Sequence, residues 1–246
     1  MERKIYRLIL FLLLAVMFYS PCSGNRSVIY RAYVTNRMDI WKNVMDRMES
    51  GMPGTNDQII ELVNYQYGYI GYCIGYKKRE EAKRYLELAE KNIILLEQRN
   101  YDRSTIDAYK CAFYGFKIGL NKLSAPINGP KSLELARSSL DHGKDNYFAH
   151  VQYGNIMFYM PATFGGSKKE GIEYFLRAKE ILERDPSDIA DNWNYMSLLL
   201  VIGQSYTYLD DLNSAKAVYE KILRLEPGFL YVKDELYPQL LKKMEN

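Results

Sequence analysis

The sequence has few of the residues that most catalytic and metal sites need. It holds two histidines, His142 and His150, and three cysteines, Cys22, Cys73 and Cys111. No HExxH, GxSxG, Walker or dinucleotide-binding motif occurs, and neither Cys73 nor Cys111 belongs to a CxxC pair. We therefore expect no catalytic residues, no metal and no cofactor, and two free buried thiols rather than a disulfide.

An excess of charge of one sign is also missing. The formal net charge is +3, and Arg3, Lys4 and Arg7, set against Glu2, supply two of these charges. Without a basic field to gather phosphates, a nucleic-acid partner is not expected. Hydrophobic residues at 48% and charged residues at 26% are typical of a folded soluble protein, and they exclude a disordered, collagen-like or polytopic membrane chain.

The sequence has no uncharged run long enough for a membrane helix near its start. The run from Leu8 to Tyr19 is shorter than the ~20 residues that a spanning helix requires. It follows a basic start and precedes small or helix-breaking residues at 20–24, which is typical of a secretory signal. We predict a signal peptide over 1–24 and an exported protein, periplasmic or associated with the cell envelope. An uncleaved anchor and a lipid on Cys22 are the alternatives.

The remainder of the chain is dominated by helical periodicity. Apolar residues recur at spacings of three and four over 81–97, 171–182 and 212–225, whereas alternating strand patterns are hard to find. We therefore predict an all-α fold. One amphipathic helix is expected over 28–49 and a final capping helix over 229–243. Residues 124–130 and 161–167 are expected to be loops, with Ser167 capping the helix that follows.

Two segments near the C-terminus carry the same pattern of large, small and aromatic positions, which ends at a proline. In the last segment these positions are Leu199, Ile202, Gly203, Tyr206, Ala215, Tyr219, Ile222 and Pro227. In the preceding segment they are His150, Tyr153, Gly154, Met157, Gly171, Phe175, Ala178 and Pro186. We interpret the small residues as the points where two antiparallel helices touch. A weaker signal predicts two earlier pairs, 65–76 with 80–97 and 109–120 with 132–140, whose first segments are centred on Gly71 and Gly115.

This pattern resembles the tetratricopeptide repeat (TPR). The resemblance implies an α-α superhelix over 25–246, with about four divergent helical hairpins, capping helices at both ends, and its clearest repeats at 147–186 and 196–230. The loop with Phe164, Gly165 and Gly166 is also similar to exported repeat proteins such as the T-component that accompanies TRAP transporters. The TPR family implies binding of a partner on a concave face lined by the first helix of each hairpin, and no catalysis.

An aromatic stripe on these first helices is the predicted ligand-binding surface. Its residues are Tyr65, Tyr72, Tyr76, Tyr109, Phe116, Phe148, Asn155, Phe158, Tyr159, Gln204 and Tyr208. The stripe has almost no charge, which disfavours a ligand that ends in a carboxylate. An apolar or aromatic peptide, a small hydrophobic molecule or the protein's own end helix would fit it. The alternative is that the rings pack in the core between neighbouring helices.

The sequence therefore predicts a non-catalytic exported repeat protein that binds a protein, a peptide or a small hydrophobic ligand. Two other functions stay open. One is a structural subunit of an envelope assembly, attached to the membrane only through a lipid on Cys22. The other is an exported enzyme whose site is too dispersed to recognise.

Overall fold

The computed structural model describes residues 22–52 and 54–245. The predicted signal peptide therefore lies outside the described residues, except for residues 22–24, which begin the first described helix. Every regular element in the described part of the chain is helical, which confirms the predicted all-α class. Among these residues no helix combines the length and the apolar character needed to cross a bilayer.

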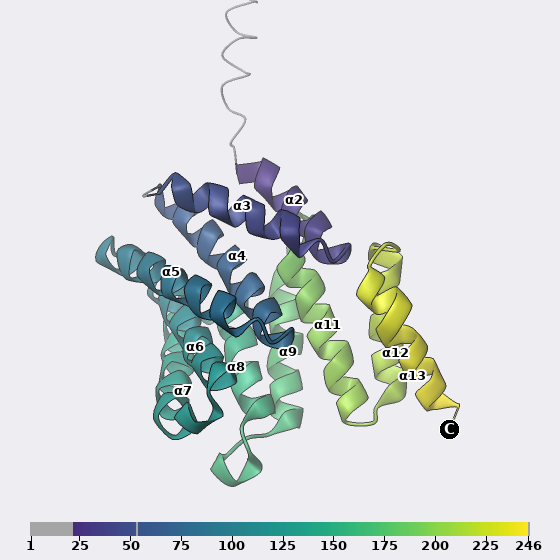
Figure 1. The fold of residues 1–246 in the computed structure, drawn as a ribbon. Helices are drawn as coiled ribbons and strands as arrows, with labels where there is room; N and C mark the ends of the chain where they lie inside the picture. The colour runs from purple at the N-terminus through teal and green to yellow at the C-terminus, as the bar shows by residue number, and fades with distance from the viewer. Residues whose placement is uncertain (1–21, 53, 246) are drawn as a thin grey trace, which may run out of the picture.

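Four antiparallel hairpins form the body of the described chain (Figure 1). They are α4 (Asn56–Gly75) with α5 (Arg79–Gln98), α6 (Arg103–Leu120) with α7 (Ala125–His142), α8 (Tyr147–Tyr159) with α9 (Lys168–Leu182), and α11 (Trp193–Tyr208) with α12 (Leu212–Leu225). A short helix, α10 (Pro186–Ile189), leads into the last hairpin. We call α4, α6, α8 and α11 the first helices. Neighbouring hairpins pack on one another in chain order, as expected for a helical superhelix.

The predicted helix over 28–49 is wrong, because two helices occupy this region. They are α2 (Cys22–Val34) and α3 (Met38–Ser50), and Asn36 between them adopts a left-handed backbone with φ of 55°. Asparagine tolerates this conformation better than most residues, and it turns the chain back so that α2 and α3 contact each other. At the other end, the expected capping helix is present as a π-helical segment, η4 (Tyr231–Leu236), that continues into α13 (Tyr237–Met244).

The predicted loop over 124–130 is also wrong. After the 3₁₀ turn η2 (Lys122–Ser124), α7 starts at Ala125 and includes Pro126 and Pro130. Pro126 stands in the first turn, where a missing N–H leaves no helical bond unmade. The connection at 161–167 is a loop as expected, with one 3₁₀ turn, η3 (Ala162–Phe164). Ser167 caps α9 by accepting a hydrogen bond from the Glu170 N–H.

Close helix contacts occur at some of the predicted small residues and not at others. A Cβ atom added to Gly171 would lie 2.9 Å from the Gly154 carbonyl oxygen, so the backbones of α8 and α9 touch there. Gly203 lies against the Tyr219 ring in the last hairpin. Gly71 and Gly115, by contrast, are exposed with nothing within 4 Å of an added Cβ. The spacing of the glycines therefore does not by itself mark a helix contact.

In the α6–α7 hairpin, serines take the place of the glycine contact. The Ser104 hydroxyl donates to the Ser139 carbonyl oxygen at 2.8 Å, and the Ser139 hydroxyl donates back to the Ser104 carbonyl oxygen at 2.7 Å. Two helical turns further along α6, the Cys111 carbonyl oxygen accepts a hydrogen bond from the Ser132 hydroxyl. Short side chains that bond to the opposite backbone let two helices approach closely while leaving no buried hydroxyl unpaired.

The N-terminal hairpin closes the array by packing against the last hairpin, since α2 contacts α11. The Arg26 guanidinium donates to the carbonyl oxygens of Ser187, Asp188 and Ala190 at 3.0, 3.2 and 2.6 Å. In the interior, the rings of Trp41 on α3 and Trp193 on α11 meet edge to face with centroids 4.9 Å apart. The described chain is therefore a superhelix whose beginning and end are joined.

Cys73 and Cys111 are both buried and free, which confirms the predicted pair of thiols. Burial raises the pKa of each thiol to about 12. A thiol that stays protonated at neutral pH is a poor nucleophile and a poor metal ligand. Both residues therefore contribute to packing in this fold.

Candidate functional site

The structure divides the predicted aromatic stripe into a covered part and an open part. The covered part is formed by Tyr65, Tyr109 and Phe148, which are buried. Trp41 on α3 donates its indole N–H to the Tyr65 carbonyl oxygen at 3.0 Å, and the rings of Tyr109 and Phe148 lie 4.5 Å apart. These rings pack within the core, because the α2–α3 hairpin and the neighbouring first helices cover them.

The open part lies at the C-terminal ends of the first helices. Tyr76, Tyr159 and Tyr208 are 60%, 72% and 66% exposed, respectively, and Gln204 is also exposed. Three further predicted residues, Tyr72, Phe116 and Asn155, are half-buried, and Phe158 is buried. The exposed rings stand where each first helix ends and its hairpin loop begins, beyond the reach of the α2–α3 hairpin.

Ring contacts join α8 with α11 in this open part, and α4 contributes a separate pair of rings. On α8 and α11, the Phe158 ring lies between Tyr159 at 5.1 Å and Tyr208 at 5.7 Å. At the end of α4, the rings of Tyr72 and Tyr76 are tilted by 39° with centroids 4.6 Å apart. Gln204 stands one helical turn before Tyr208, so both side chains share a face of α11.

The C-terminal segment η4 adds Tyr231, a residue that the sequence analysis did not include. Burial raises the pKa of the Tyr231 phenol, the charges of Glu235 and Tyr76 add to this rise, and Gln204 opposes it through a hydrogen bond. Tyr231 is thus near both Tyr76 on α4 and Gln204 on α11. Tyr231 therefore connects the α4 side of the open part with the α11 side. The sequence pattern could not predict its place in the site, because that place depends on how the C-terminal segment folds back.

Two lysines at the starts of α5 and α9 also reach the open part, so positive charge lies beside a stripe that has almost none of its own. The Lys168 ammonium lies 4.8 Å from the Phe158 centroid and 4.7 Å from the Tyr208 centroid, and it donates to the Phe158 carbonyl oxygen at 3.0 Å. The Lys78 ammonium lies 4.9 Å from the Tyr72 centroid and donates to the Tyr72 hydroxyl at 3.3 Å. Ammonium groups over ring faces form cation–π contacts. Both lysines stand where the second helix of a hairpin begins, Lys78 directly before α5 and Lys168 as the first residue of α9.

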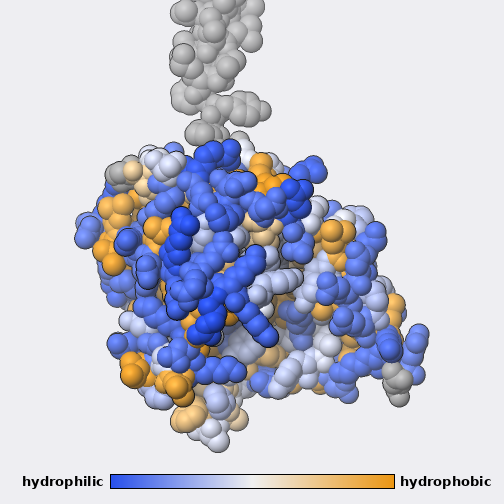
Figure 2. All heavy atoms as spheres, viewed as in Figure 1, coloured by the Kyte–Doolittle hydropathy of each residue, from blue (hydrophilic) through white to orange (hydrophobic). Residues whose placement is uncertain are grey.

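We name this surface the aromatic mouth. It consists of Tyr72, Tyr76, Lys78, Phe158, Tyr159, Lys168, Gln204, Tyr208 and Tyr231. The molecular surface is hollowed between the part that holds α4 and α5 and the part that holds α12 and α13, and atoms of intermediate hydropathy line this hollow (Figure 2). Chemically, the mouth offers ring faces, phenol and amide hydrogen bonds, and two cations.

The comparisons with known proteins give little guidance. No family model matches the chain, and no curated protein matches it. Among solved structures, the chain is similar to the HusA haemophore from Porphyromonas gingivalis, with a TM-score of 0.48 and 17% sequence identity over 68% of this chain and 94% of the haemophore chain. The TPR assignment thus stays a prediction from the sequence pattern.

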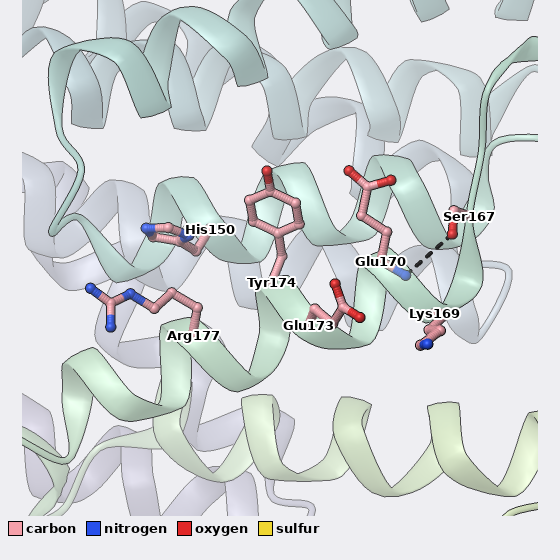
Figure 3. Close-up of a pocket in the computed structure, with 7 residues that line it drawn as sticks. All are labelled: His150, Ser167, Lys169, Glu170, Glu173, Tyr174 and Arg177. Atoms are coloured by element: carbon pink, nitrogen blue, oxygen red, sulfur yellow. Dashed lines mark hydrogen bonds between the residues drawn. The ribbon is translucent and has the colours of Figure 1, made fainter.

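A cavity of about 520 Å³ lies along α9, away from the aromatic mouth, and is lined by residues of both charges (Figure 3). Its lining residues are His150, Ser167, Lys169, Glu170, Glu173, Tyr174 and Arg177. His150 is buried and its Nε2 atom bonds to the Lys144 carbonyl oxygen at 2.8 Å, while its Nδ1 atom has no partner. The Ser167 hydroxyl accepts a hydrogen bond from the Glu170 N–H and thereby caps α9.

No cluster of histidine, cysteine and carboxylate side chains suited to a metal ion is present among the residues that the structure describes. His142, the other histidine, is exposed at the end of α7 and bonds through Nδ1 to the Ser138 carbonyl oxygen. The aromatic mouth is therefore the stronger candidate site.

Proposed function

We propose that the chain is a non-catalytic TPR-type binding protein, and that it holds an apolar or aromatic ligand at the aromatic mouth. A short peptide with an aromatic side chain and a small hydrophobic molecule are the two ligand forms that suit it. The observation that carries the proposal is the gathering of Tyr76, Tyr159 and Tyr208, each more than half exposed, at one end of the array. Contiguous exposed apolar surface on a folded chain is typical of a binding site.

The chemistry of the rings supports binding. Tyrosine offers a large, rigid contact area with only two rotatable side-chain bonds, so ordering it against a ligand costs little entropy. The rings of Tyr72, Phe158 and Tyr208 also carry a lysine ammonium on one side. A ligand that pairs an aromatic group with an acidic group would contact ring and ammonium together. The earlier reason for disfavouring carboxylates is thereby removed.

A binding titration with anilinonaphthalene sulfonate tests the proposal, because this probe combines fused aromatic rings with an anion. We expect saturable binding to the full chain, weakened ~5- to 30-fold by Tyr208→Ala or Tyr76→Ala, since each ring supplies contact worth about 1–2 kcal/mol. Ile94→Ala, which removes a half-exposed apolar side chain from α5, is the matched control. Equal affinities in all three variants would contradict the proposal.

A peptide library displayed against the same chain distinguishes the two ligand forms. Enrichment of peptides with aromatic residues, lost in Tyr208→Ala, identifies a peptide ligand. Dye binding without peptide enrichment identifies a small hydrophobic molecule. Catalysis is tested in the same samples, because turnover of any bound probe would favour the alternative of an enzyme.

We also propose that the protein is exported, as the segment 1–24 predicts, and that it acts in the periplasm or at the cell envelope. The mass of the chain recovered from its own cells tests this, because cleavage removes the leader. An added diacylglycerol mass on Cys22 would instead favour the lipid-anchored structural subunit. An unprocessed chain in the cytosol would contradict both.

A further inference from the structure

A second exposed apolar surface lies next to the aromatic mouth but shares no residue with it. Leu123, Ile127 and Phe164 are 88%, 66% and 76% exposed. Leu123 and Phe164 belong to the α6–α7 and α8–α9 connections, and Ile127 to the first turn of α7. Because α8 packs on both α6 and α7, these two connections are neighbours at the lower end of the molecule (Figure 1). Apolar atoms gather along this edge in the space-filling view (Figure 2).

The backbone beneath these side chains is ordered by hydrogen bonds. In the α8–α9 connection, the N–H groups of Phe164 and Gly166 both donate to the Pro161 carbonyl oxygen, at 2.9 and 3.2 Å, and Gly165 supplies the left-handed turn with φ of 93°. In the α6–α7 connection, Asn121 accepts a bond from the Leu123 N–H at 3.2 Å. The apolar side chains are therefore held outward on tight turns.

Lysines are the charged residues within both connections, while Glu87 and Glu90 on α5 and Glu170 on α9 lie beside them. Residues 114–133 contain three lysines and no acidic residue, and residues 159–169 contain two lysines and no acidic residue. Lys122 and Lys169 are exposed, and neither belongs to an ion pair with another described residue. The edge thus combines projecting apolar groups with unpaired positive charge, in a chain whose overall charge is only +3.

We propose that this edge, formed by Leu123, Ile127 and Phe164 with Lys122 and Lys169, docks on an anionic lipid surface. Apolar side chains that project from a convex edge can enter the acyl boundary of a bilayer without needing a complementary pocket. The lysines lie beside them, where ammonium groups meet anionic headgroups. A protein partner would have to supply a separate hollow for each projecting side chain.

The test places a fluorescent reporter at the edge. In the full chain, Phe164→Trp is mixed with vesicles of phosphatidylcholine alone or with added phosphatidylglycerol. We expect a blue shift, and quenching by brominated acyl chains, only with the anionic vesicles. The native tryptophans, Trp41 and Trp193, are buried and supply a constant background. Ile94→Trp, on the exposed face of α5, is the matched control and should not shift.

Two sets of added substitutions separate the apolar and the charged contributions. In the Phe164→Trp chain, Leu123→Ser with Ile127→Ser should weaken vesicle binding at least ~tenfold. Lys122→Gln with Lys169→Gln should weaken binding ~tenfold or more on anionic vesicles. Every variant keeps the same N-terminus, so residues 1–21 contribute equally to each measurement. These side chains are exposed, so the melting temperature should not change.

Three results would overturn the proposal. They are the lack of any shift at position 164 with anionic vesicles, an equal shift at position 94, and a shift that appears only when a protein partner is added. The last result would reassign the edge to protein docking. Tyr208→Ala should leave vesicle binding intact, so the aromatic mouth and the lipid edge can fail independently.

Discussion

The side-chain amides of Asn64 and Asn194, which are 130 positions apart in the sequence, exchange two hydrogen bonds of 3.1 Å each. Asn64 also accepts the Trp193 indole N–H at 2.8 Å and donates to the Tyr109 hydroxyl at 3.0 Å. A single asparagine on α4 thereby connects α6 and α11. This polar contact joins the first and last hairpins inside an otherwise aromatic interior.

We expect Asn64→Leu to lower the free energy of unfolding by about 1–3 kcal/mol, because it leaves the buried Trp193 N–H without a partner. Urea unfolding measures the change. Asn43→Leu, at an exposed position on α3, is the matched control and should shift stability by no more than about 0.5 kcal/mol. Equal effects at the two positions would show that the amide pair does not hold the array closed.

The same substitution should have opposite effects at two glycines. Gly171→Ala is expected to destabilise the protein by about 1–3 kcal/mol, because its Cβ would lie 2.9 Å from the Gly154 carbonyl oxygen. Gly115→Ala should instead stabilise it by about 0.5–1 kcal/mol, because nothing lies within 4 Å of the new Cβ and alanine favours a helix. Thermal unfolding of both variants gives the two signs. Destabilisation by Gly115→Ala would show that its surroundings are tighter than described.

Two aromatic residues of the mouth should separate stability from binding. Phe158→Ala is expected to cost about 3–5 kcal/mol, because the ring is buried and its removal leaves a cavity. Tyr208→Ala should cost no more than about 1 kcal/mol, since most of that ring is exposed, yet it should weaken ligand binding. Melting temperatures and dye titrations on the two variants check this. A stable Phe158→Ala variant would mean that the ring is accessible.

Stability should fall in alkaline solution because of the two buried thiols. The pKa of Cys73 and of Cys111 is raised to about 12 in the folded chain, against about 8.5 in an unfolded one. Above pH ~8.5 the unfolded chain loses these protons while the folded chain keeps them, so the contribution to stability declines until the pH passes the folded value. Urea unfolding at increasing pH measures the slope.

Thiol reactivity provides an independent check of the same residues. Ellman's reagent at pH 8 should react slowly with Cys73 and Cys111 in the folded chain, and quickly once urea unfolds it. The unfolded chain is measured without reductant, so that a disulfide would be detected. Fast reaction of both thiols in the folded state would contradict their burial.

The hairpins were predictable from the sequence where small residues coincide with helix contacts. Gly154, Gly171 and Gly203 mark contacts that the spacing indicates. Gly71 and Gly115 follow the same spacing but are exposed, because the α6–α7 contact uses serines and α4 places Gly68 against Trp41 and Trp193. A repeat pattern states which residue is small but not which face of its helix meets a neighbour.

The candidate site was predictable only in part, for a similar reason. Helical periodicity places Tyr65 and Tyr76 on one stripe, yet Tyr65 is covered by Trp41 from α3 and Tyr76 is open. Whether a ring on the stripe is buried depends on how the distant α2–α3 hairpin packs over it. The periodicity of a single helix carries no information about that packing. The positions of Lys168 and Tyr231 likewise follow from the packing of the loop and of the C-terminal segment, which a first-helix projection leaves out.

The bonds of Arg26 to the carbonyl oxygens after α9 have a consequence for how such a chain can evolve. Open repeat arrays gain and lose units easily, since each unit touches only its neighbours. Here an inserted hairpin would pull Arg26 away from Ser187 and Ala190, and it would part Asn64 from Asn194. Duplication of a unit is therefore penalised. A change of length is expected to cost least in the hairpin loops, which lie next to both proposed binding surfaces.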